Sequence, residues 1–169
     1  MDVSNVIKIK ETSNYDTAVI IINTQFFLLP LLNKYIDSIE KSDEYMKSHN
    51  SISYISDEEK QNSEKYNKIL GYIYYNLDKC IQHSKKNYNT NRLSVLVNLK
   101  NTKFTQIDFM FIKHLISKMY IDYEPNLNSM IFANYSGTIK TIYGIIKPFL
   151  DKDTVKKIKL ENKLDIETI

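Results

Sequence analysis

The chain has 169 residues, a formal net charge of +3 and 43% hydrophobic residues. Arg92 is the single arginine among 23 basic residues. This argues against a nucleic-acid reader, because such proteins use arginine for bidentate contacts with bases and phosphates. Every apolar run is far shorter than the ~18 residues that a membrane-spanning helix needs. The start of the chain also lacks the apolar core of a signal peptide.

These features lead us to expect a cytoplasmic protein. The excess of isoleucine, lysine, asparagine and tyrosine indicates an AT-rich coding genome, such as that of a large DNA virus or a protist. The length favours one globular domain, which we place at residues 17–169. Residues 1–16 are expected to be poorly ordered, apart from a short strand at residues 6–9.

The first half of the chain predicts one strand followed by two helices. Residues 18–22 are a continuous and mostly β-branched run, which is typical of a parallel-sheet strand buried on both faces. Apolar residues then recur at helical spacing over residues 26–49. A capping-box pattern at residues 56–59 predicts the start of a second helix, which continues to about Lys85.

The second half alternates strands with helices. Residues 93–99 predict a strand, residues 107–120 a buried helix, and residues 129–134 a third strand. This alternation predicts an α/β fold with a mainly parallel central sheet flanked by helices.

An apolar helix is predicted over residues 138–150, after a break at residues 135–137, and a short segment begins at Asp151. Its apolar stripe is formed by Ile139, Ile142, Tyr143, Ile146 and Phe149. The stripe is explained either by packing on the sheet or by roofing an apolar cavity. The lysines that follow suit either an anionic membrane surface or a solvated face.

Residues that could carry chemistry are scarce. His49, His83 and His114 have no partners at metal-ligand spacing, and the three glycines form no phosphate-binding loop. Cys80 falls on the apolar side of a predicted helix, which favours a buried structural thiol. We therefore expect no enzymatic activity, no metal and no cofactor.

The C-terminal part resembles CRAL-TRIO lipid-binding domains. The resemblance rests on a strand that ends at Asn134 and leads to a helix, then on Lys147, Pro148, Phe149, Leu150, Asp151, Thr154, Val155, Lys157 and Ile158. Upstream, residues 93–125 resemble the family's strand ending in Asp-Leu-Lys-Gly and the helix that leads to Tyr-Pro-Glu. The chain is identified as a divergent, compact member that lacks the family's N-terminal helical domain.

The resemblance implies non-enzymatic binding of a phospholipid or other hydrophobic ligand in a pocket roofed by helix 138–150. The resemblance also implies a role in lipid transfer or membrane-linked signalling, in which the protein would contact a membrane surface as a peripheral protein. The implied ligand-binding residues are Asn134, Tyr135, Ile139, Ile142, Tyr143, Ile146, Phe149 and Lys157. Among these, Lys157 matches a lysine that helps to hold an inositol phosphate.

Several positions depart from the family pattern. Pro125 and Asn126 stand where phosphoinositide-binding members carry a Glu-Arg pair, and Asn98 replaces the aspartate of Asp-Leu-Lys-Gly. An alternative is therefore a BCH-like scaffold, whose pocket is filled by its own side chains and whose partners are small GTPases or their regulators. The tyrosine content, 13 residues, suits such an interface.

Overall fold

The computed structural model describes residues 6–12, 14–24, 57–102, 115, 119, 121–135, 137, 143–144 and 147–169. The helix predicted over residues 26–49 lies outside these residues, as does most of the helix predicted over residues 107–120. In the described part of the chain, no helix is long and apolar enough to cross a membrane.

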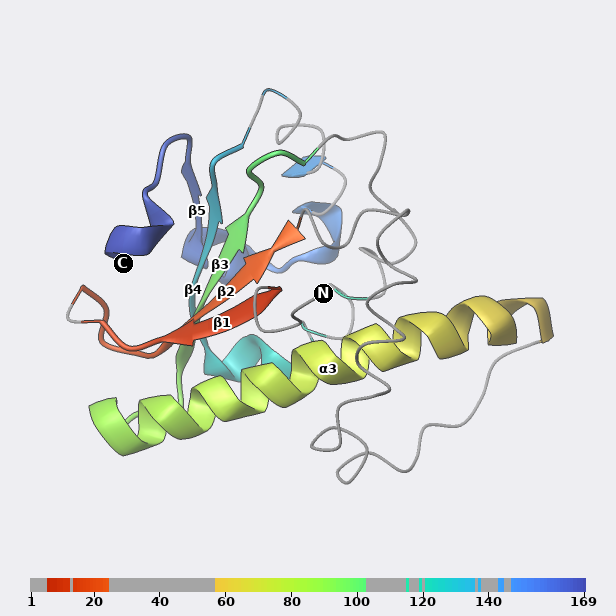
Figure 1. The fold of residues 1–169 in the computed structure, drawn as a ribbon, viewed down its shortest axis with the longest axis horizontal. Helices are drawn as coiled ribbons and strands as arrows, with labels where there is room; N and C mark the ends of the chain where they lie inside the picture. The colour runs from red at the N-terminus through yellow and green to blue at the C-terminus, as the bar shows by residue number, and fades with distance from the viewer. Residues whose placement is uncertain are drawn as a thin grey trace.

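A five-stranded sheet forms the centre of the molecule (Figure 1). Its strands follow chain order: β1 (Ile7–Lys10), β2 (Val19–Asn23), β3 (Leu93–Asn98), β4 (Leu127–Ala133) and β5 (Ile158–Glu161). Neighbours pair in parallel except β1 and β2, which are antiparallel. The predicted α/β fold with a mainly parallel sheet is confirmed.

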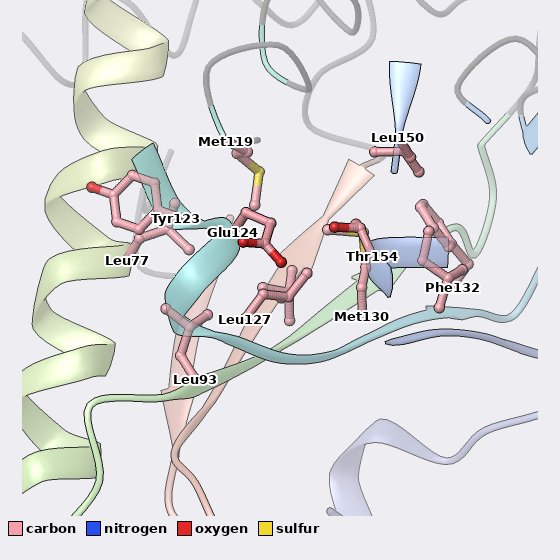
Figure 2. Close-up of a pocket in the computed structure, with 12 residues that line it drawn as sticks. Leu77, Leu93, Met119, Tyr123, Glu124, Leu127, Met130, Phe132, Leu150 and Thr154 are labelled. Carbon is pink, nitrogen blue, oxygen red and sulfur yellow. The ribbon is translucent and has the colours of Figure 1, made fainter. Parts of the chain in front are cut away.

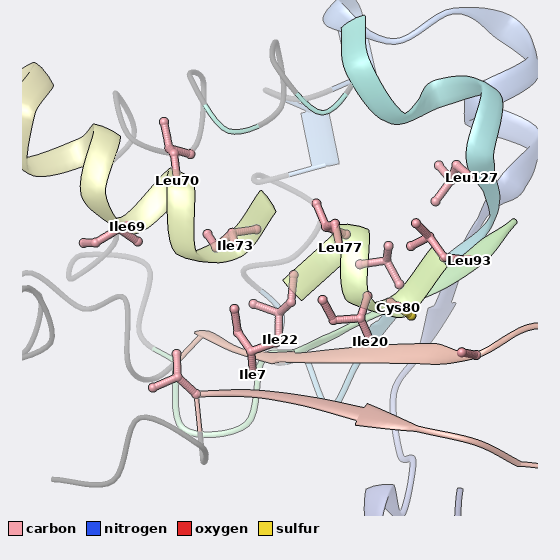
Figure 3. Packing of buried hydrophobic residues seen from close by; sticks show 13 residues of the cluster. Ile7, Ile20, Ile22, Ile69, Leu70, Ile73, Leu77, Cys80, Leu93 and Leu127 are labelled. Carbon is pink, nitrogen blue, oxygen red and sulfur yellow. The ribbon is translucent and has the colours of Figure 1, made fainter. Parts of the chain in front are cut away.

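Helix α3 (Asp57–Tyr88) covers one face of the sheet. It begins within the predicted capping box and extends three residues beyond the predicted end at Lys85. Its buried side chains Ile73, Leu77 and Cys80 belong to the same core cluster as Ile20 of β2 and Val95 of β3 (Figure 3). Burial raises the pKa of the Cys80 thiol to about 12, so the thiol stays protonated near neutral pH. The prediction of a buried structural thiol is confirmed.

The opposite face of the sheet is covered differently. Val19, Ile21 and Leu96 alternate with the residues that face α3, and they form a cluster with Leu164 and Ile166. The second covering layer in the described part is therefore the C-terminal segment, which contains the short 3₁₀ helix η6 (Ile166–Thr168). Figure 1 shows this segment on the side of the sheet away from α3.

A short helix begins after Asp151, as predicted. The Asp151 carboxylate caps α6 (Lys152–Lys157) by accepting bonds from Asp153 N at 2.6 Å and Thr154 N at 2.9 Å. Its second oxygen accepts from Thr154 Oγ1 at 2.7 Å. The chain then enters β5, a strand that the sequence analysis did not predict.

The cap makes the stability of the protein sensitive to acid. Hydrogen bonds from Thr154 lower the pKa of Asp151 from 3.8 to about 2. A lowered folded-state pKa stabilises the fold above the unfolded-state pKa, and this contribution is lost as the pH falls toward the folded-state value. We expect Asp151→Asn to be less stable than the wild type at neutral pH, with the difference shrinking between pH 3.8 and pH 2. Urea unfolding across this range measures it, and a difference independent of pH would contradict the assignment.

Candidate functional site

An apolar cavity lies between α3, β3, β4 and α6, on the α3 side of the sheet (Figure 2). Its volume is about 50 Å³. Its lining is Leu77, Leu93, Val95, Met119, Tyr123, Glu124, Leu127, Met130, Phe132, Leu150, Thr154 and Ile158. These residues come from separate parts of the chain, and the sheet and α3 hold them in place.

One wall of the cavity is formed by Tyr123, which packs against a second tyrosine outside the lining. The rings of Tyr74 on α3 and Tyr123 stack with their centroids 5.7 Å apart. The Tyr123 hydroxyl donates to Asp78 Oδ1 at 2.9 Å. Burial and this bond raise the pKa of Tyr123, so its hydroxyl stays protonated and remains a donor. The wall therefore ties α3 to the segment that leads into β4.

An ion pair links α6 to the segment before β4, beside the apolar lining. Lys157 Nζ lies 3.0 Å from Glu124 Oε1 and also donates to the Glu124 carbonyl at 3.3 Å. The two side chains are 28% and 31% exposed, respectively. The half-buried ammonium is therefore already partnered, and a ligand anion would have to share it or displace Glu124.

The predicted ligand-binding residues lie in several places. Ile139, Ile142 and Ile146 fall outside the described residues, as does most of helix 138–150. The described part of that helix includes the 3₁₀ helix η5 (Lys147–Phe149), whose last residue is the predicted Phe149. Tyr143 is half-buried, and Lys147 Nζ lies 6.0 Å from the centre of its ring.

Two other predicted residues, Asn134 and Tyr135, directly follow β4, but they contribute to different parts of the molecule. Tyr135 packs against the small core cluster of Leu99 and Phe132. Asn134 has a positive φ of 56°, which asparagine tolerates better than most residues. It lines a second concavity, which also includes Ile21 from the far face of the sheet. Among the described members of the predicted set, Asn134 therefore lines a different concavity from the apolar cavity.

None of the twelve residues that line the cavity was predicted as a ligand-binding residue. Met119 was placed in a buried helix, Met130 and Phe132 in a strand, and Leu150 at the end of helix 138–150, each without a ligand-binding role. Apolar periodicity does not separate a cavity wall from a packed core. Met130 and Phe132 are two residues apart on β4, so the alternation of side chains along a strand places them on one face. This spacing was the sequence signal that could have identified them. No group of acidic, histidine or cysteine residues in the described part could hold a metal ion.

Comparison with known proteins agrees with the sheet and its connections. The family model for the CRAL/TRIO domain matches residues 41–169, and this chain belongs to that family. No curated protein sequence matches it significantly.

Among solved structures, the fold resembles that of Sfh5, a Sec14-family protein, in the structure titled "Crystal structure of Sfh5". The TM-score is 0.59 at 16% sequence identity. The match covers 94% of this chain and 48% of Sfh5, so the chain spans about half the length of that protein. At this identity the likeness concerns the fold.

Proposed function

We propose that this protein binds a phospholipid or another hydrophobic small molecule without catalysing a reaction. The observation that carries the proposal is the apolar cavity between α3 and β4 in a chain of the CRAL/TRIO family, whose members bind lipophilic molecules. Residues 138–150 would roof the ligand. Lipid transfer or membrane-linked signalling would be the cellular role.

The size of the cavity sets a condition on this function. A volume of about 50 Å³ is well below the roughly 300–1,000 Å³ of typical ligand pockets. An acyl chain would therefore enter only if the residues that line the cavity moved apart. Burial of each CH₂ group would stabilise the complex by about 0.8 kcal/mol through the hydrophobic effect. A long acyl chain would therefore offset the free-energy cost of opening the cavity.

Mass spectrometry of lipids extracted from protein purified from cells tests the proposal. We expect a lipid at close to one molecule per protein, and uptake of labelled lipid from phosphatidylcholine vesicles. Lipid-free protein that also takes up nothing from vesicles would contradict the proposal.

Lys157 would contact the ligand head group or the membrane surface, in competition with Glu124. Removing the Glu124 charge would leave the ammonium with fewer local anions, and a partly buried cation attracts anions more strongly than an exposed one. We expect Glu124→Gln to raise binding to phosphatidylserine vesicles and Lys157→Gln to lower it, both measured by co-sedimentation. Lys152→Gln, at an exposed position on the same helix, is the charge-matched control for Lys157→Gln. If Lys157→Gln and the control lose vesicle binding equally, Lys157 has no specific role in binding the head group or the membrane.

The small cavity favours a second candidate, a protein-interaction scaffold with a filled pocket. In this case the partner would be a small GTPase or one of its regulators. Affinity purification would return a partner in stoichiometric amount, while the purified protein would carry no lipid. Lipid at one molecule per protein would argue against this candidate.

A further inference from the structure

A polar concavity of about 790 Å³ lies over the sheet face opposite the apolar cavity. It reaches from the carboxyl ends of β2, β3 and β4 to the lysines of β1, and residues of the C-terminal segment border it. Its lining is Lys8, Lys10, Ile21, Asn23, Asn98, Lys100, Asn134, Asn162, Lys163, Leu164, Asp165, Ile166 and Glu167. It shares no lining residue with the apolar cavity, so the two can be tested separately.

Three asparagines stand in a row across the floor of this concavity. Asn23 ends β2, Asn98 ends β3, and Asn134 follows β4. Asn98 Nδ2 donates to Asn23 Oδ1 at 2.7 Å, and Asn134 Nδ2 donates to Asn98 Oδ1 at 3.2 Å. The Asn134 oxygen accepts from Leu164 N at 2.9 Å, which fixes the C-terminal segment beside the row. The row is therefore a preorganised polar floor at the carboxyl ends of β2, β3 and β4.

The lining of the concavity contains four lysines but only two acidic residues. Lys8 and Lys10 alternate with Ile7 and Ile9 on β1, so they share the face of Ile21 rather than that of α3. Lys10 Nζ donates to the Ile166 carbonyl at 2.9 Å. In the described part of the chain, the ammonium groups of Lys8, Lys100 and Lys163 take part in no ion pair. The concavity therefore keeps positive charge available to a ligand.

We propose that this concavity binds a small phosphorylated ligand. Lysine ammonium groups suit phosphate as point charges, and amide side chains can hydrogen-bond the polar groups attached to it. The phosphate would lie among Lys8, Lys100 and Lys163, above the asparagine row. The same phosphate chemistry can belong to a free metabolite or to a lipid head group, so the experiment distinguishes these sources.

Isothermal titration of the full chain with inorganic pyrophosphate tests the free ligand. Co-sedimentation with phosphatidylcholine vesicles carrying phosphatidic acid tests the head group. The informative variant is Lys100→Gln/Lys163→Gln, which removes two exposed charges from the concavity. The matched control is Lys86→Gln/Lys152→Gln, which removes two exposed charges from α3 and α6.

We expect the concavity variant to weaken binding of at least one probe about tenfold, while the control changes it little. Loss confined to pyrophosphate identifies a free phosphorylated ligand, and loss confined to vesicles identifies a head group. Binding should also weaken as salt increases, because exposed charges are screened beyond ~10 Å at 0.1 M ionic strength. The proposal is overturned if neither probe binds, or if both double variants lose the same affinity. Thermal melts of the variants establish that both remain folded.

Discussion

Replacing Ile73 by alanine is expected to destabilise the protein by about 2–5 kcal/mol. Ile73 is fully buried on α3, in the core cluster that joins this helix to β2 and β3 (Figure 3). The substitution removes apolar contacts and leaves a void that the strands can only partly close. Small domains are stable by about 5–15 kcal/mol, so the loss is a large share of the total.

Urea unfolding followed by circular dichroism measures this loss, and Gln82→Ala is the matched control. Gln82 lies on the same helix but is exposed, so its change should stay within about 0.5 kcal/mol. Ile73 does not line the apolar cavity, so ligand uptake by the folded fraction should be retained. A change in stability no larger than that of Gln82→Ala would show that α3 does not pack on the sheet in this way.

The central strands and α3 could be predicted from the sequence because their signals are local. The run at residues 18–22 is buried on both faces in β2, with Ile20 on the α3 side and Ile21 on the other. The capping box and the helical spacing after it likewise correspond to α3. In each case, burial requires a pattern that one short stretch of sequence carries alone.

The edge strand β5 carries a much weaker signal. The four residues of β5 alternate apolar with charged side chains, and Lys159 and Leu160 are exposed. Short charged strands are typical of sheet edges, where they discourage pairing with other chains. The lysines of this stretch were therefore interpreted as a membrane-facing or solvated surface. The pairing of β5 with β4 depends on contacts between distant residues, which local periodicity does not reveal.

The site was harder to predict than the fold for a related reason. The prediction placed most ligand contacts on one apolar helix, residues 138–150. The cavity lining, by contrast, combines Leu77 from α3, Val95 from β3 and Met130 from β4. Such a set becomes visible only when strand register and helix position are known. The asparagine row is a similar case, because its members are separated by 75 and 36 residues.

Placing a charge in the cavity is expected to suppress lipid uptake at least about tenfold. Met130 lies on β4 opposite Val95 of β3 and lines the apolar cavity (Figure 2). In Met130→Glu, an acyl chain could enter only by desolvating a carboxylate that stands among mostly apolar lining residues. We expect less co-purifying lipid and slower uptake of labelled phosphatidylcholine from vesicles.

Leu160→Glu is the matched control, because it introduces the same charge at an exposed position on β5. It should take up lipid as the wild type does. A thermal melt establishes whether Met130→Glu folds. If it does not, Leu150→Gln, at a half-buried position in the lining, tests the same surface with a smaller perturbation.

These variants also separate the two candidate functions. If Met130→Glu and Leu150→Gln both fold and both lose lipid while the control keeps it, the ligand occupies the space between α3 and β4. If the wild type carries lipid that neither variant loses, the lipid binds elsewhere, and the cavity of about 50 Å³ is part of a packed core. If the wild type carries none and takes none from vesicles, the filled cavity and a stoichiometric protein partner would together establish the scaffold function.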